Sequence, residues 1–117
     1  MHESSLPDPL DALVAAPEHH RLIFENAQVR VLDTRIAPGD RTPVHTHRWP
    51  AVHYVVSWSD FVRRDAAGAV LADTRGKVPP PPEALWGEPL PPHSLENVGT
   101  AALHIISTEV KAAGTGV

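Results

Sequence analysis

Histidines whose spacing suits metal binding are concentrated in one short stretch of the chain. His45 and His47 are two positions apart, and residues two apart on a β-strand point to the same face of a sheet. Two neutral imidazoles on one face can bind one metal ion. The turn residues Pro38-Gly39 precede this pair and the apolar run Val52–Val56 follows it. The pattern therefore predicts two strands with the histidine pair near their junction.

A second stretch carries another histidine close to the start of a strand, His93, just after a pair of prolines. The pattern Gly-x5-His-x-His, followed further along the chain by His-x3-Asn-x-Gly, resembles the two motifs of the cupin superfamily. The matching positions are Gly39, His45, His47, Tyr54, Val55, Val56, His93, Asn97 and Gly99. The resemblance implies a small β-barrel whose mouth holds one divalent metal, with His45, His47 and His93 as its ligands.

One position departs from the cupin pattern at the metal ligands. Cupins usually carry a glutamate ligand three residues before the tyrosine position, and this chain has Ala51 there. His53 follows two residues later on the same strand face. It either replaces the missing ligand or lines the pocket and contacts substrate or water. Without a carboxylate ligand the metal keeps its full positive charge, which favours an anionic chelating substrate.

The identity of the metal and the reaction stay open at this point. The chain has no cysteine, which leaves histidine, aspartate and glutamate as strong metal ligands. Iron, zinc, nickel and manganese all accept imidazole, so we expect one divalent metal per subunit without choosing among them. Some cupin dioxygenases use three-histidine ferrous sites, so the resemblance favours a dioxygenase if the protein is an enzyme. A metal-dependent isomerase or lyase and a non-catalytic module that binds or senses a small molecule are the alternatives.

Several side chains near the expected mouth are candidates for the substrate pocket. Trp49 lies two residues after the histidine pair and could form a pocket wall. Arg41 and Arg48 flank the pair, and either could bind a substrate carboxylate, although a solvated arginine is the more ordinary interpretation. Trp86 and His104 are further pocket candidates, and the sequence does not decide which face of its strand His104 occupies.

The N-terminal part of the chain predicts a short helix. Asp8 can cap it, and Pro17 ends it. His19 and His20 come directly after this helix. We expect both to face solvent, since neighbouring residues on an extended chain point apart and make a poor chelating pair.

The rest of the chain predicts an all-β domain. Thirteen prolines among 117 residues, with short apolar runs between frequent turn signals, are typical of a sandwich or barrel. Together with the motifs, this predicts a cupin-type double-stranded β-helix, or jelly-roll, barrel. The expected regions are an N-terminal segment at 1–19, the barrel at 20–110 and a flexible tail at 111–117.

Charge and hydropathy narrow the possible partners. The formal net charge of −4 argues against a nucleic-acid or anionic-membrane surface. The chain has no long apolar run and no signal-peptide pattern at its start, so the expected compartment is the cytoplasm. The expected partner is a small-molecule ligand.

The strand expected at Ala51–Trp58 is informative about assembly. Val52, Tyr54, Val56 and Trp58 alternate with the residues expected to face the pocket, and they would form an apolar outer face. An outer face of this kind needs a cover. We therefore expect a homodimer.

Overall fold

The structure is a computed structural model that describes residues 8–77 and 82–111. The predicted tail at 111–117, apart from Lys111, and most of the proline run at 79–82 lie outside the described residues. Within them the chain forms one short helix and nine strands. Their bounds are α1 Ala12–Ala15, β1 His20–Glu25, β2 Val29–Ile36, β3 His45–His47, β4 Ala51–Ser57, β5 Phe61–Asp65, β6 Val70–Asp73, β7 Ala84–Gly87, β8 Leu90–Asn97 and β9 Leu103–Val110.

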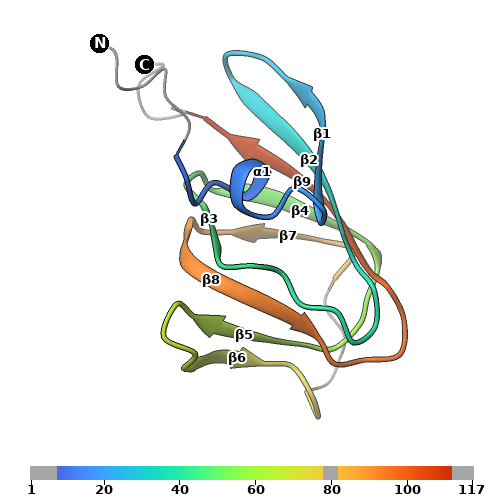
Figure 1. The fold of residues 1–117 in the computed structure, drawn as a ribbon. Helices are drawn as coiled ribbons and strands as arrows, with labels where there is room; N and C mark the ends of the chain where they lie inside the picture. Colours follow the sequence, from blue (N-terminus) through green and yellow to red (C-terminus); the bar gives the residue numbers. More distant parts are fainter. Residues whose placement is uncertain (1–7, 78–81, 112–117) are drawn as a thin grey trace.

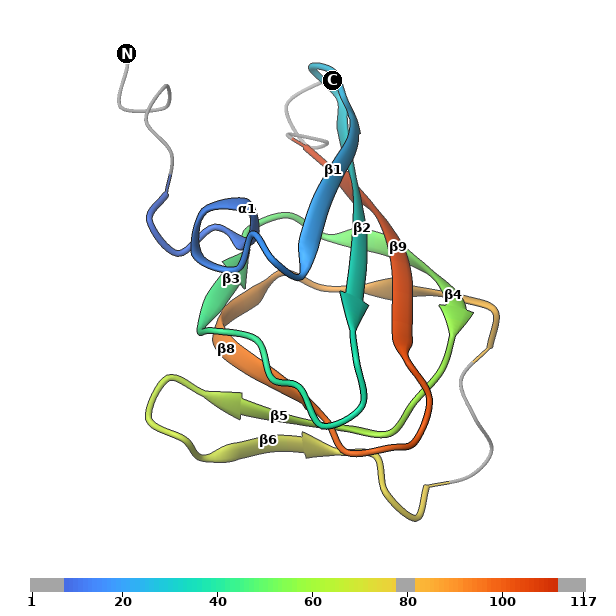
Figure 2. The same cartoon turned by 45° about the vertical axis from the view of Figure 1, so that its right-hand side comes forward.

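The strands form two antiparallel sheets that face each other (Figures 1 and 2). One sheet has the order β1-β2-β9-β4-β7 and the other has the order β3-β8-β5-β6. Strands distant in sequence are therefore neighbours: β9 lies between β2 and β4, and β8 lies between β3 and β5. This is the pairing of a jelly roll. The predicted all-β barrel with a short N-terminal helix is confirmed.

Strand β4 shows the predicted alternation over most of its length. Ala51 is buried, while Val52, Tyr54 and Val56 are exposed on the outer face. The prediction is wrong for Trp58, whose side chain lines the internal cavity. The strand ends at Ser57, and its register with β9 shifts just before that residue. This irregularity breaks the two-residue period and turns Trp58 inward.

The helix is shorter than predicted and has a different cap. Asp11, not Asp8, is the N-cap, and its side chain accepts a hydrogen bond from the Leu13 backbone N–H at 3.0 Å. Asp8 instead accepts one from the Leu10 N–H. The helix packs against β1 and β3 at one end of the barrel and buries Ala12 completely (Figure 1).

The asparagine of the second motif has a structural role. Asn97 is fully buried at the end of β8. Its amide donates to the carbonyl oxygens of Ile36 and Ala101, and its oxygen accepts from Ser59 Oγ and the Gly99 N–H. One side chain thus joins four segments at the end of the barrel opposite α1.

Candidate metal site

The pairing of β3 with β8 brings the two histidine motifs together. His45 lies directly opposite His93 in this register, and their ring centroids are 4.4 Å apart. The register shifts between His45 and His47, at the point where β8 carries its two prolines. Prolines fit such an irregularity because they cannot donate to a regular ladder. The His47 ring lies 5.0 Å from that of His45 and 5.6 Å from that of His93.

His20 joins this cluster, which the sequence did not predict. Its side chain is buried, and its ring lies 4.7 Å from that of His45 and 5.3 Å from that of His47. One ligand atom from each of these three residues lies within 4.8 Å of the others, so the group could hold a metal ion. The expectation that His20 faces solvent is wrong. His19 instead turns away, with its Nε2 atom 2.8 Å from Asp40, so the two neighbours do point apart as the alternation rule requires. That rule alone could have predicted that one of the two faces inward.

The cluster thus consists of four histidines, His20, His45, His47 and His93. Each of them is fixed by a hydrogen bond at its Nδ1 atom. Each Nδ1 lies 2.8–3.1 Å from an oxygen that can only accept a hydrogen bond. The acceptors for His20, His45, His47 and His93 are, in that order, Ala16 O, Pro43 O, Glu109 Oε2 and Pro91 O. These bonds place the proton on Nδ1 and leave the Nε2 lone pair free in the neutral ring. That is the tautomer of a histidine that binds metal through Nε2.

Burial keeps three of these rings neutral. Loss of solvation lowers the pKa of His20 to about 3, that of His45 to about 4 and that of His93 to about 3. All three therefore offer lone pairs at neutral pH.

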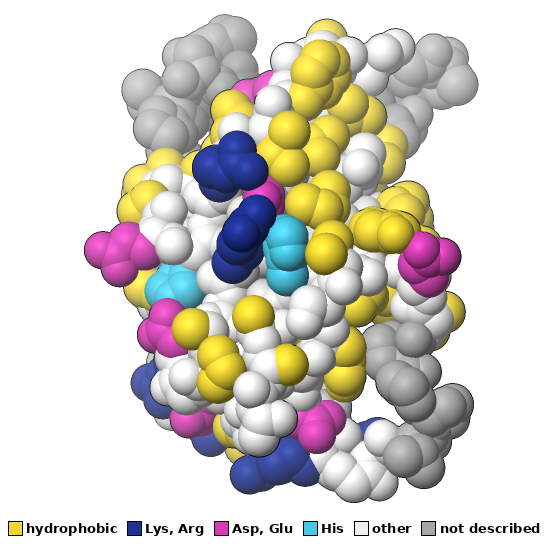
Figure 3. Space-filling view, turned by 90° about the vertical axis from the view of Figure 1, so that its right-hand side faces the viewer, with side chains coloured by type: hydrophobic (Ala, Val, Ile, Leu, Met, Phe, Trp, Pro, Cys, Tyr) yellow, Lys and Arg dark blue, Asp and Glu magenta, His cyan; other side chains and the backbone are white. Residues whose placement is uncertain are grey.

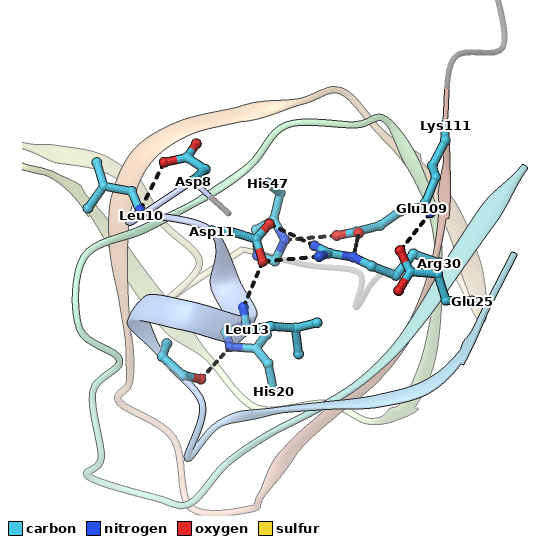
Figure 4. A network of polar contacts seen from close by, with 11 residues as sticks. Asp8, Leu10, Asp11, Leu13, His20, Glu25, Arg30, His47, Glu109 and Lys111 are labelled. Atoms are coloured by element: carbon cyan, nitrogen blue, oxygen red, sulfur yellow. Dashed lines mark hydrogen bonds and ion pairs between the residues drawn. The ribbon is translucent and has the colours of Figure 1, made fainter. Parts of the chain in front are cut away.

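A buried ionic network continues behind His47 (Figure 4). Glu109, 1% exposed, accepts from the His47 ring through one oxygen and from Arg30 Nε, at 2.7 Å, through the other. The two terminal nitrogens of Arg30 donate to the two Asp11 oxygens at 3.0 and 2.9 Å. Burial alone would raise the pKa of Asp11, but hydrogen bonds and charge from Arg30 lower it overall. The network ties α1, β2 and β9 to one candidate ligand.

The clustered histidines line a cavity of about 210 Å³ between the two sheets. The other walls are mainly apolar and aromatic, and the described lining residues include no aspartate or glutamate. Arg63 is the one arginine or lysine among them. Such a cavity suits a small ligand with an apolar body.

His53 lines this cavity but stands apart from the cluster. Its Nδ1 lies 2.7 Å from Ser107 Oγ. Its Nε2 abuts Gly87 on the neighbouring strand, where a side-chain Cβ would come within 2.5 Å of it. Both ring nitrogens are thus turned to the barrel wall. Of the two roles that the sequence left open, this placement favours the pocket wall.

The other predicted pocket residues lie outside the cavity. Trp86 is opposite Val52 on the outer face and 53% exposed, because its neighbour Leu85 takes the inward position. His104 likewise alternates with the inward Leu103, and its Nε2 lies 2.9 Å from Asp33.

The three candidates next to the histidine pair also point elsewhere. Arg41 is exposed and forms a β-bridge with Glu96. Trp49 is covered by cations, with the Arg48 guanidinium 4.7 Å and that of Arg30 5.0 Å from its ring centroid. Trp49 and Arg48 therefore lie beside the ionic network, and none of the three residues lines the cavity.

Comparisons with known proteins show which solved structures share this fold. No protein-family model and no curated protein match the chain. A cupin domain from Bordetella pertussis Tohama I is 19% identical, with a TM-score of 0.61 over 80% of this chain and 92% of that one. An uncharacterized conserved protein with a double-stranded β-helix domain from Klebsiella pneumoniae is 16% identical, with a TM-score of 0.57 over 80% and 76%. An RmlC-like cupin family protein from Methanocaldococcus jannaschii is 6% identical, with a TM-score of 0.56 over 78% and 77%.

Proposed function

We propose that this chain, which has the double-stranded β-helix fold of the cupins, binds one divalent metal and a small organic ligand in its barrel. The ligands in this proposal are His20, His45 and His47, with His93 as a fourth. The observation that carries it is that four clustered histidines are each fixed through Nδ1 with Nε2 free, and that three of them, His20, His45 and His93, are buried and held neutral. Fixed second partners of this kind are typical of metal-binding histidines.

The metal would supply Lewis acidity or, if it is iron, redox chemistry. The chain itself orients these histidines, adds no described carboxylate to the ligand set and would enclose the substrate between mainly apolar walls. These features support an anionic chelating substrate. We favour oxidation of such a substrate with dioxygen as the enzymatic reaction, and an isomerase or lyase reaction as the second. A non-catalytic binding or sensing module is the alternative outside catalysis, since the fold serves many functions.

Elemental analysis of protein purified without chelator tests the metal. We expect about one divalent metal per chain, and its identity separates redox from non-redox chemistry. His47→Ala should lower metal affinity at least tenfold, because loss of a direct ligand costs more than the loss of a supporting contact. His104→Ala, which removes a histidine outside the cavity, is the control. Unchanged metal content in the His47 variant would contradict the proposal.

A turnover assay then separates enzyme from binding module. Metal-dependent dioxygen consumption with a chelating carboxylic acid would support the dioxygenase. Saturable binding of the acid without product would support the module.

We also propose a homodimer formed through the outer face of the larger sheet. Val52, Tyr54, Val56 and Trp86 are 42–53% exposed there, and hydrophobic side chains gather across this side of the molecule in Figure 3. A contiguous apolar face of this kind is typical of an interface. The cytoplasmic location stays a prediction from the sequence. Among the described residues, no helix is long and apolar enough to cross a membrane.

A further inference from the structure

Arg63 is placed inside the barrel next to the histidine cluster. It lies on β5 opposite Leu95 of β8, and two residues further on Asp65 is opposite His93. The Asp65 carboxylate accepts hydrogen bonds from the Ala67 and Ala69 N–H groups in the turn after β5 and does not line the cavity. Diagonal neighbours on one sheet face are roughly 7–8 Å apart, so Arg63 and His93 project from adjacent positions. The charge of Arg63 contributes to lowering the pKa of His93 and His53. Arg63 therefore shares the cavity with the candidate ligands.

Unlike Arg30 and Arg64, Arg63 has no carboxylate partner among the described residues. Arg30 binds Asp11 and Glu109, and Arg64, the next residue, donates to Glu96 at 2.8 Å. The Nε atom of Arg63 is buried without any hydrogen-bond partner. Its guanidinium lies 5.5 Å from the centroid of the Phe61 ring, which also lines the cavity. A buried guanidinium N–H left without an acceptor is costly and calls for an explanation.

We propose that Arg63 anchors a carboxylate of the ligand that this cavity binds, so that the ligand is a small carboxylic acid with an apolar body. This inference deepens the proposed function, since it concerns the ligand of the same site. The planar guanidinium presents Nε–H and a terminal N–H side by side, which matches the two oxygens of a carboxylate. With a divalent metal at the neutral histidines and the guanidinium of Arg63, the cavity would carry three positive charges, and its described wall has no acidic side chain. An anion bound between the metal and Arg63 would offset part of this charge.

The probe is benzoate, and its uncharged counterpart benzamide is the matched control ligand. Calorimetric titrations use the full chain, both as purified and after removal of metal by chelator and dialysis. We expect metal-free protein to bind benzoate about tenfold or more tightly than benzamide, because a hydrogen bond to a charged group adds that much. Arg63→Met should abolish this preference. Arg64→Met should keep it, because Arg64 is engaged with Glu96.

Two further measurements separate an anchor from a structural residue. Arg63→Met should melt at the same temperature as the unmodified protein or above it, because it removes an unpaired charge. Arg63→Lys keeps the charge without the planar fork and should bind benzoate with intermediate affinity. Equal binding of benzoate and benzamide, or an unchanged preference in Arg63→Met, would overturn the inference. Metal content measured on the same samples tests the metal proposal separately, since a protein without metal could still show the Arg63-dependent preference.

Discussion

Ala51 and Glu109 lie directly opposite each other on β4 and β9, and both are buried. In the sequence pattern that resembles the cupin motif, Ala51 has the position of the usual glutamate ligand. A carboxylate is therefore present at this level of the barrel, but it comes from the neighbouring strand and contacts the Nδ1 side of His47. The Glu109 carboxylate therefore supports a candidate metal ligand instead of being one, and the small Ala51 side chain leaves room for it.

Glu109→Gln should weaken metal binding by roughly 10–100-fold, the usual cost of losing a contact that supports a metal ligand. The amide cannot stabilise the charge of a metal-bound imidazole as a carboxylate does. Titration of the metal-free variant with Zn²⁺ measures the change. Glu96→Gln, at a half-buried pair on the other sheet, should leave affinity unchanged. An affinity for the Glu109 variant within twofold of the unmodified protein would contradict this role.

Glu109→Gln should also destabilise the fold, because it leaves Arg30 with one carboxylate partner instead of two. Breaking a buried ion pair costs about 3–5 kcal/mol when the other charge stays uncompensated. The remaining pair with Asp11 makes a smaller loss the expected result. Urea unfolding in the presence of chelator measures it separately from metal binding. Stability equal to that of the unmodified protein would show that Glu109 adds nothing to the Asp11–Arg30 pair.

His20→Ala should lower metal affinity at least tenfold if His20 is a direct ligand. The matched control is His19→Ala, which removes the neighbouring histidine that contacts Asp40 instead of the cluster. Both variants remove a largely buried ring, so the difference between them isolates the metal contribution. Equal affinities in the two variants would leave His45, His47 and His93 as the metal ligands and would assign His20 to packing.

The parts of the site that local rules govern were predictable from the sequence. His45 and His47 share a face because strand side chains alternate, and the same period placed Val52, Tyr54 and Val56 outside. The outward position predicted for Trp58 was wrong because one register shift at the end of β4 reverses the alternation, and no residue type marks that shift.

The side chains that distant strands contribute to the cavity could not be predicted from these local rules. His20 and Arg63 reach the cavity because β1 and β5 enter different sheets that face each other. The rule that adjacent residues point apart still allowed one of His19 and His20 to be inward. Choosing between them required the position of α1, because the carbonyl of its C-cap residue, Ala16, accepts a hydrogen bond from the His20 ring.

The outer face of the larger sheet should hold two copies together. Val52→Glu should dissociate the dimer, because it places an unpaired charge in an apolar interface. Val70→Glu makes the same change on β6, at a more exposed position of the other sheet, and should leave assembly intact. Sedimentation velocity at micromolar concentration compares them. A purely monomeric unmodified protein would contradict the proposed dimer.

Stability of the metal-free protein should fall as the pH is lowered from about 6.5 toward 4.5. Burial lowers the pKa of His20, His45 and His93 to about 3–4, against about 6.5 in the unfolded chain. Between these values the unfolded state binds more protons than the folded state, so the free energy of unfolding decreases with decreasing pH. Each such histidine contributes up to about 1.4 kcal/mol per pH unit.

Urea unfolding at several pH values in that window, with chelator present, measures this slope. The window lies above the ordinary pKa of aspartate, so the ion-paired Asp11 and Asp33, whose pKa values are lowered, contribute little to it. His93→Gln removes one of the titrating rings and should reduce the slope by close to one proton. His104→Gln, outside the cavity, is the control and should retain most of it. A free energy of unfolding that stays constant from pH 6.5 to 4.5 would show that the clustered rings are not held neutral by burial.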